Sequence, residues 1–267
     1  MSRSKRSLLF LLTLTLIIST LGVIAAQEYM NPNVWPDLEG REVYIAVENA
    51  YPPYNYLNDD NEAVGWDYDT FDAICELLNC VPVYEETGWD GMLIAIAAGE
   101  FDVAADGITY TKERAQSVDF SRLYQAYDET LLVREGEDRF STVAELLEVA
   151  DFRVATQIGT TNEITAKALF GPMNVQSYDV FGAAIEALLN DDVDAVAVDR
   201  PAAEGWIESQ GGLMTIDESI SGIQGLSFAF PKGSDLVEPI NAAMWALQHG
   251  GIWDEIYAKW FGAQPTS

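Results

Sequence analysis

A loop of nine residues, Asp106–Arg114, combines side chains that suit the binding of a small zwitterion. It reads Asp-Gly-Ile-Thr-Tyr-Thr-Lys-Glu-Arg and follows a strand-like segment. Gly107 allows close backbone approach, Thr109 supplies a hydroxyl and an N–H group, and Arg114 offers a planar fork for a carboxylate. Taken alone, an ordinary loop or a surface ion pair is the simpler interpretation of this segment.

Two further segments place polar groups at strand ends. Gly159-Thr160-Thr161 joins a strand-like segment to a helical one, where free N–H groups favour an anion. Asp199 ends another strand-like segment, and its carboxylate could accept an ammonium group. Because such segments occur together, at strand ends in both halves of the chain, they favour a binding site over a set of ordinary loops.

Sequence motifs of the common catalytic and cofactor sites are missing. There is no Gly-x-Ser-x-Gly elbow, no His-Glu-x-x-His, no Gly-Lys-Ser/Thr phosphate loop and no dinucleotide fingerprint. His249 is the only histidine, and its place before two glycines indicates a helix C-terminus, so a catalytic triad lacks a base. We therefore expect no catalytic residue, no metal and no cofactor.

The charge balance excludes two classes of partner. The chain has 267 residues, of which 43 are acidic and 14 basic, giving a formal net charge of −29. Nucleic acids and anionic lipid surfaces both need clustered Lys and Arg, so we expect neither as a partner. Hydrophobic residues make up 49% of the chain, which is too much for a disordered protein.

Residues 1–26 resemble a secretory signal peptide. Arg3, Lys5 and Arg6 form a basic start, and an uncharged, mostly apolar run follows from Leu8 to Ala26. The run is long enough to serve as an uncleaved membrane anchor, but its four Ser and Thr residues favour cleavage. We therefore expect export to a periplasmic or extracellular location, with anchoring as the alternative.

The two cysteines, Cys75 and Cys80, lie at the end of a predicted helix. In an oxidising compartment a disulfide between them would tie the helix end to the following turn. Two free buried thiols are the alternative, because a spacing of five is awkward within a regular helix. We favour the disulfide.

Strand-like and helix-like segments alternate along the chain, which predicts an α/β protein with mainly parallel sheets. A helix with Phe71, Ile74, Leu77 and Leu78 on its apolar face is expected to be capped by Asp69 or Thr70. The predicted strands are residues 43–47, 101–105, 153–158 and 193–198. The other predicted helices are residues 92–97, 161–170, 181–189, 236–248 and 252–261, with one more beginning near Pro201.

With these motifs in this order, the sequence resembles the polar-amino-acid solute-binding proteins of ABC importers over about residues 42–261. Gly65–Asp69 is similar to the family's Gly-aromatic-Asp segment, and Asp106–Arg114 to its ligand-carboxylate loop. Ala46–Tyr54 resembles the first strand and cleft loop, and Asp119–Ser121 the run before the crossover.

The resemblance implies the periplasmic-binding-protein type II fold. This is an α/β fold of two lobes with central mixed sheets, joined by two crossover strands, with the ligand cleft between them. Lobe 1 would comprise residues 27–130 and 226–267, and lobe 2 residues 131–225. The crossovers would lie near Ala126–Thr130 and Gly225–Phe228.

The resemblance also implies ten ligand-binding residues. Arg114, with Thr109 and Thr161, would bind the α-carboxylate, and Asp199 and the Gly107 carbonyl region the α-ammonium. Tyr51 and Trp89 would flank the ligand side chain, while Glu48, Asp106 and Gln157 would set its polarity. Two departures from the family pattern stand out: Asp106 replaces a small residue, and Arg200 could shield the ammonium site beside it.

The implied function is that of an exported, monomeric protein that captures a free amino acid for the membrane permease of an ABC importer. Glu48 and Asp106 would be left without a cation, which favours a cationic ligand such as arginine, lysine or ornithine. A neutral polar amino acid such as glutamine would be favoured if Asp106 turned outward or paired with Arg200. A dehydratase of prephenate-like acids on the same fold, or a membrane-anchored amino-acid sensor, would also fit the sequence.

Overall fold

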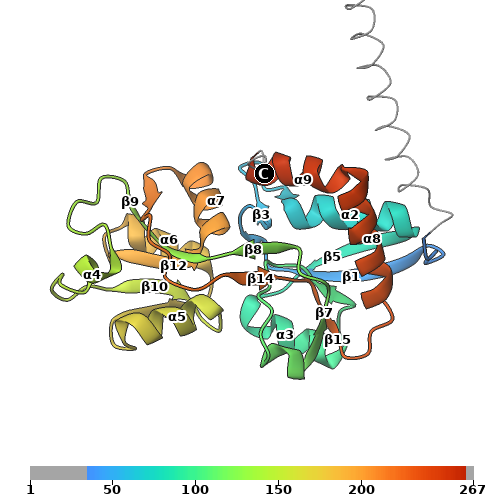
Figure 1. The fold of residues 1–267 in the computed structure, drawn as a ribbon, viewed down its shortest axis with the longest axis horizontal. Helices are drawn as coiled ribbons and strands as arrows, with labels where there is room; N and C mark the ends of the chain where they lie inside the picture. The colour runs from blue at the N-terminus through green and yellow to red at the C-terminus, as the bar shows by residue number, and fades with distance from the viewer. Residues whose placement is uncertain (1–34, 263–267) are drawn as a thin grey trace, which may run out of the picture.

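Two five-stranded sheets form the centres of two lobes in the computed structural model, which describes residues 35–262 (Figure 1). The predicted signal peptide, residues 1–26, lies outside the described residues. No helix within the described part of the chain is both long enough and apolar enough to cross a membrane.

The sheet of the first lobe has the strand order β5-β1-β6-β15-β7. Its members are β1 (Arg41–Val47), β5 (Cys80–Glu86), β6 (Val103–Ala104), β7 (Val118–Phe120) and β15 (Ala229–Pro231). Strand β1 is parallel to β5 and β6, whereas β15 is antiparallel to β6 and β7.

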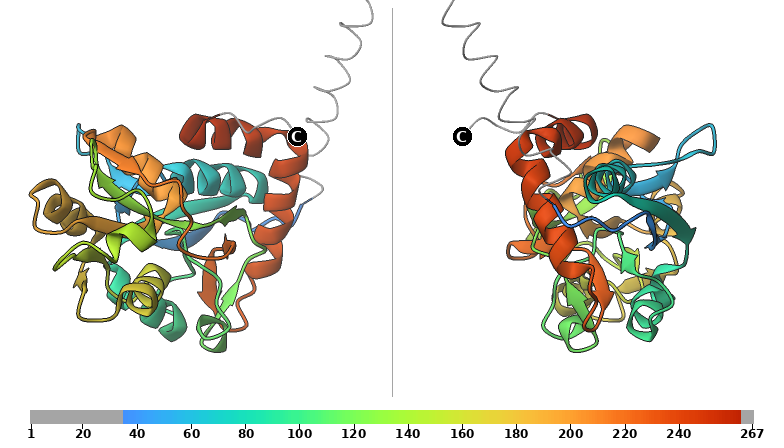
Figure 2. Two further views of the ribbon diagram at one scale, coloured as in Figure 1. Left: turned by 60° about the vertical axis from the view of Figure 1, so that its left-hand side comes forward. Right: turned by 90° about the vertical axis from the view of Figure 1, so that its right-hand side faces the viewer.

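Alternate residues of β1 face opposite sides of this sheet. Val43, Ile45 and Val47 pack with α2 (Trp66–Leu78) and α8 (Val237–Gly250), and Ala46 packs with α3 (Trp89–Ala98) on the other side. Figure 2 shows α8 running along this lobe with α9 (Ile252–Phe261) across its end. Both faces of the sheet are therefore covered, which explains the continuous burial of residues 45–47.

The sheet of the second lobe has the order β11-β10-β12-β9-β13. Its members are β9 (Glu129–Arg134), β10 (Val154–Gln157), β11 (Val175–Tyr178), β12 (Ala195–Asp199) and β13 (Leu213–Thr215). Strand β10 is parallel to β11 and β12, and β9 is antiparallel to β12 and β13. On one face lie α4 (Val143–Leu146) and α5 (Thr161–Phe170), and on the other α6 (Phe181–Leu189) and α7 (Arg200–Gln210).

Two short strands run between the lobes. They are β8 (Gln125–Tyr127) and β14 (Gln224–Leu226), which pair antiparallel with Ala126 opposite Gly225. The α/β fold with two mixed sheets and two connecting strands is thus confirmed, while the exact residue boundaries of the lobes stay a prediction. A small three-stranded sheet, β2 (Ala50–Tyr51), β3 (Asn55–Leu57) and β4 (Ala63–Val64), projects from the first lobe.

Helix α2 begins at Trp66, so the predicted caps at Asp69 and Thr70 are wrong. The residue before the helix is Gly65, where a Cβ atom would lie 2.1 Å from the carbonyl oxygen of Tyr54. Asn79 ends the helix in the left-handed conformation, which turns the chain directly into β5. This reversal explains how two cysteines five positions apart, Cys75 and Cys80, can form a disulfide.

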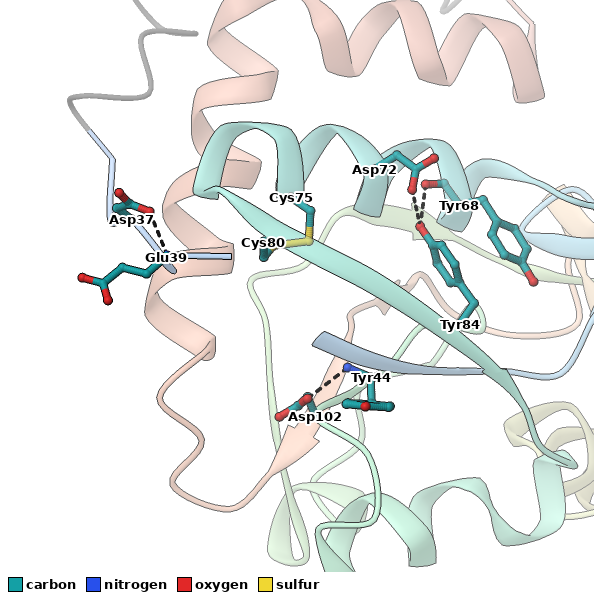
Figure 3. Close-up of a disulfide and its surroundings, with 9 residues drawn as sticks. All are labelled: Asp37, Glu39, Tyr44, Tyr68, Asp72, Cys75, Cys80, Tyr84 and Asp102. Atoms are coloured by element: carbon teal, nitrogen blue, oxygen red, sulfur yellow. Dashed lines mark hydrogen bonds between the residues drawn. A yellow bond between two sulfur atoms is a disulfide. The ribbon is translucent and has the colours of Figure 1, made fainter. Parts of the chain in front are cut away.

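Cys75 and Cys80 form that disulfide, as predicted (Figure 3). It joins the last turn of α2 to the first residue of β5. Further along the same pair of elements, the Tyr84 hydroxyl donates to the backbone carbonyl of Tyr68 and to Asp72. The disulfide and these hydrogen bonds hold α2 on β5 at two places.

The carboxyl ends of the central strands are directed toward the space between the lobes. Glu48 directly follows β1 and Asp106 lies two residues after β6, while Gln157 and Asp199 are the last residues of β10 and β12. Ligand sites of open α/β sheets lie beyond the carboxyl ends of the strands. The two sheets therefore bring polar residues from both halves of the sequence to one place.

Candidate functional site

A small cavity lies between the lobes and is lined by residues of both. All ten residues predicted from the sequence line it, together with Thr160 of the segment expected to favour an anion and two residues that were not predicted, Asn162 and Phe181. The roles of the ten as ligand contacts stay a prediction.

Arg114 provides the positive charge of the cavity. It opens a short 3₁₀ helix (Arg114–Gln116), and its guanidinium donates to the carbonyl of Thr109 at 2.9 Å and to that of Gly159 at 3.3 Å. The guanidinium also lies 5.0 Å from the centre of the Trp89 ring. Burial lowers the pKa of Arg114, but an arginine keeps its charge in proteins.

Hydroxyl groups lie next to this guanidinium. Thr109 Oγ1 is 2.7 Å from the Tyr127 hydroxyl and 3.2 Å from Thr161 Oγ1, across the two lobes. Thr160 caps α5 by accepting a hydrogen bond from the backbone N–H of Glu163, and Thr161 is the first residue of the helix. A guanidinium, hydroxyl groups and a helix N-terminus together favour a carboxylate.

Asp199 provides a carboxyl group for a cation. It is 2% exposed, and it accepts hydrogen bonds of 2.7 Å from the Tyr51 hydroxyl and from Asn162 Nδ2. Burial raises the pKa of Asp199 to about 7, an effect that these two hydrogen bonds oppose. A cation bound here would restore the ionised form near neutral pH.

Arg200 does not compete for this group. Its Nε and Nη2 atoms donate to the two carboxylate oxygens of Asp128, each at 2.9 Å. Arg200 is absent from the residues that line the cavity. The expectation that Arg200 could shield the ammonium site is therefore wrong.

Glu48 and Asp106 face the cavity as a pair of buried carboxyl groups. Glu48 accepts a hydrogen bond of 2.7 Å from Gln157, and Asp106 one of 2.8 Å from Asn55. Burial, together with the charge of Asp106, raises the pKa of Glu48 to about 8, and burial raises the pKa of Asp106 to about 7. Among residues 35–262, neither carboxyl group is within ion-pair distance of a Lys, Arg or His.

Asp106 is 3% exposed and lines the cavity. The expectation that it could turn outward or pair with Arg200 is therefore wrong. Behind it lies a residue pair that the sequence did not indicate, because Asn55 Nδ2 also donates to Asp67 at 2.9 Å. Asp67 is fully buried, and burial raises its pKa to about 8. Three buried carboxyl groups thus lie at or just behind one side of the cavity.

Aromatic rings close the cavity between the lobes. Tyr51, from the first lobe, stacks on Phe181 at the start of α6 with the ring centres 5.3 Å apart. On its other side Tyr51 stacks on Tyr54 at 5.5 Å. Phe181 was missed because its partner is far away in sequence, although its place as the first apolar residue of a predicted helix was visible.

The arrangement suits a zwitterion with a further positive charge. Arg114 and Asp199 place a guanidinium and a carboxyl group in one cavity, and Glu48 and Asp106 add two further acidic groups. Within the described chain, no group of three or more His, Cys, Asp or Glu side chains has the arrangement of a metal site.

Comparisons with known proteins agree with this geometry. The model of the family "bacterial extracellular solute-binding proteins, family 3" matches residues 43–263. A "probable histidine-binding protein" of Campylobacter jejuni is 28% identical over 255 residues, covering 94% of this chain and 98% of that protein.

Solved structures with the same fold include the arginine-, lysine-, histidine-binding protein ArtJ from Geobacillus stearothermophilus. The TM-score is 0.77 at 29% identity, over 85% of this chain and 97% of that one. An ancestral arginine-binding protein bound to arginine has a TM-score of 0.76 at 30% identity, over 84% of this chain and all of that one. An ancestral arginine-binding protein bound to glutamine has a TM-score of 0.76, also at 30% identity, over 83% of this chain and 98% of that one.

Proposed function

Because the chain belongs to family 3 of the bacterial extracellular solute-binding proteins, a family of non-catalytic proteins, we propose that it captures a cationic amino acid for an ABC importer. Arg114 binds the α-carboxylate, Asp199 binds the α-ammonium, and Glu48 and Asp106 receive the positive side chain. The relatives named for arginine, lysine and histidine support this ligand class.

The observation that carries the proposal is the pair of carboxyl groups without a cation. Burying an ionised carboxylate without a partner is costly, so Glu48 and Asp106 are held partly protonated near neutral pH. A guanidinium or ammonium between them provides the missing charge. Trp89 lines the same cavity and adds an aromatic face that attracts cations.

A neutral polar amino acid such as glutamine is the second candidate. Protonated carboxyl groups can donate hydrogen bonds as well as accept them, so a neutral Glu48 or Asp106 could bind a side-chain amide. The ancestral arginine-binding protein that has been solved with glutamine supports this candidate. The dehydratase alternative has less support, because the family that matches residues 43–263 is one of solute-binding proteins.

The protein works outside the cytoplasmic membrane as a monomer and delivers its ligand to a membrane permease. The match to an extracellular family supports this location. The net charge of −29 favours attraction of cations over anions. Residues 1–26 act as a cleaved signal peptide rather than an anchor. Sequencing the N-terminus of the secreted protein tests the cleavage, because an intact Met1 contradicts it.

A thermal-shift screen with the standard amino acids and ornithine tests the proposed function. A ligand that binds only the folded protein stabilises it by RT ln(1 + L/Kd), where L is the ligand concentration, and so raises the melting temperature. Arginine, lysine or ornithine should give the largest shift. A panel in which no amino acid raises the melting temperature contradicts the proposal.

A further inference from the structure

One glycine in the interior of a helix touches the opposite lobe. Gly205 is buried within α7, which packs on β9, β12 and β13 of the second lobe. A Cβ atom at this position would lie 2.8 Å from the backbone C and O atoms of Pro52 and from Cδ of Pro53. Pro52 and Pro53 follow β2 in the first lobe, and Figure 1 shows α7 at the edge of its own lobe nearest to β3.

Glycine is needed at position 205 because it has no side chain, and not because of its backbone conformation. Gly205 is absent from the glycines with positive φ, and it lies within a regular helix of eleven residues. Alanine is a better helix former than glycine, so the helix itself favours a side chain here. The neighbouring atoms are backbone and ring atoms, which cannot rotate away as the end of a flexible side chain can.

Tyr51, the residue before Pro52, meets the second lobe inside the cavity. The Tyr51 ring stacks on Phe181, and its hydroxyl donates to Asp199 at 2.7 Å. Gly205 itself is not among the residues that line the cavity. The contact of α7 with Pro52 therefore lies outside the ligand site but next to the residue that links the two lobes within it.

We propose that Gly205 is a positioning residue for ligand capture. The two lobes can lie as close together as they do in this structure only if α7 has no side chain facing Pro52. This inference rests on the proposed binding function. A ligand that contacts both lobes is held by the closed state, so a substitution that disfavours closure weakens binding without touching the ligand. Gly205→Ala acts in this way, since its methyl group occupies the space that Pro52 and Pro53 fill.

Gly182→Ala is the matched control. Gly182 also lies in a helix of the second lobe, α6, but a Cβ there would meet only a Trp206 ring atom at 3.8 Å, an ordinary contact. Both substitutions add one methyl group to a helical glycine. They differ in whether that methyl group meets the opposite lobe.

The test compares the wild-type protein, Gly205→Ala and Gly182→Ala by calorimetric titration with L-arginine and L-glutamine, and by small-angle scattering with and without these amino acids. We expect Gly205→Ala to bind about tenfold or more weakly and to keep a larger radius of gyration at saturation. Its melting temperature without ligand should equal or exceed that of the wild type. Gly182→Ala should match the wild type in affinity and radius.

An affinity within about threefold of the wild type, with an equal radius of gyration, overturns the inference. A lower melting temperature without ligand at an unchanged radius also overturns it, because it indicates a packing role within one lobe. If the wild type binds neither amino acid, the proposed function in this form fails, and the radii of gyration alone decide the inference. In that case a larger radius of gyration for Gly205→Ala than for the other two proteins supports the inference, and equal radii of the three proteins overturn it.

Discussion

The hydroxyl of Tyr51 donates a hydrogen bond of 2.7 Å to Asp199 Oδ2 and so links strand β2 of the first lobe to the last residue of a strand in the second. Both groups line the cavity. The residue that is proposed to bind the ligand's ammonium is therefore held in place from the opposite lobe.

Tyr51→Phe tests this link. The variant keeps the ring that stacks on Phe181 but loses the hydrogen bond to Asp199, and a hydrogen bond to a charged group contributes about 1.5–3 kcal/mol. We expect the affinity for the bound amino acid to fall by about one to two decades in calorimetry. Tyr110→Phe, at an exposed tyrosine of the same lobe, is the control. A twofold effect or less for Tyr51→Phe contradicts the role of its hydroxyl.

Arg114→Ala tests the carboxylate contact. Removing one partner of a buried charge pair costs roughly 3–5 kcal/mol, or about two to four decades of affinity. We expect binding to become unmeasurable by calorimetry while the circular dichroism spectrum stays unchanged. Arg122→Ala, at an exposed arginine of the same lobe, should bind like the wild type. A loss of less than about tenfold for Arg114→Ala rules out Arg114 as the main contact.

The regular elements and some cavity residues, such as Thr109, Arg114 and Asp199, could be predicted from local signals in the sequence. Other cavity residues, such as Glu48, Tyr51 and Trp89, were implied only by the resemblance to the family. Thr161–Phe170, Phe181–Leu189 and Ile252–Phe261 are helices with the bounds that their apolar spacing predicts. Residues at strand ends, such as Asp199, follow from the rule that α/β sheets bind ligands there. The disulfide followed from export and from two cysteines close in sequence.

Contacts between distant side chains could not be predicted in this way. Arg200 is next to Asp199 in sequence, but it pairs with Asp128, 72 positions away. Asn55 joins Asp67 to Asp106 through one amide nitrogen, and nothing local in the sequence indicates that these three residues meet. Helix α2 begins at Trp66 because of the close approach of Gly65 to Tyr54, which is a tertiary contact.

The stability of the ligand-free protein should fall as pH rises from about 5 to 8. Burial raises the pKa of Glu48 and Asp67 to about 8 and of Asp106 and Asp199 to about 7, against about 4 in the unfolded chain. Across this window the folded state binds more protons than the unfolded state, so the free energy of unfolding decreases with pH.

Thermal denaturation between pH 5 and pH 8 measures this slope. Asp67→Asn should flatten it, because the amide keeps the shape of the protonated carboxyl group and does not ionise. Asp60→Asn, on the exposed turn before β4, should leave the slope unchanged. A melting temperature that rises over this pH range in the wild type would show that the buried carboxyl groups ionise freely in the folded protein.

Removal of the disulfide should destabilise the protein without changing ligand affinity. Closing a loop as short as Cys75 to Cys80 contributes about 2 kcal/mol in the chain-entropy model. Cys80 is the first residue of β5, whereas the site residues follow the carboxyl ends of strands, so the bond lies at the other edge of the sheet. Urea denaturation and calorimetry of the double variant Cys75→Ala/Cys80→Ala check both parts. An affinity loss above about threefold would contradict the separation.

Calorimetric titration of the wild type and Asp106→Asn with arginine, lysine, glutamine and glutamate tests the central claim most directly. The account predicts that the wild type binds arginine or lysine more tightly than glutamine, with glutamate weakest, because Glu48 and Asp106 require a positive partner. Asp106→Asn should reduce the preference for the cationic ligand over glutamine by about tenfold or more. A preference of the wild type for glutamate, or a preference for the cation that Asp106→Asn leaves unchanged, would contradict the account.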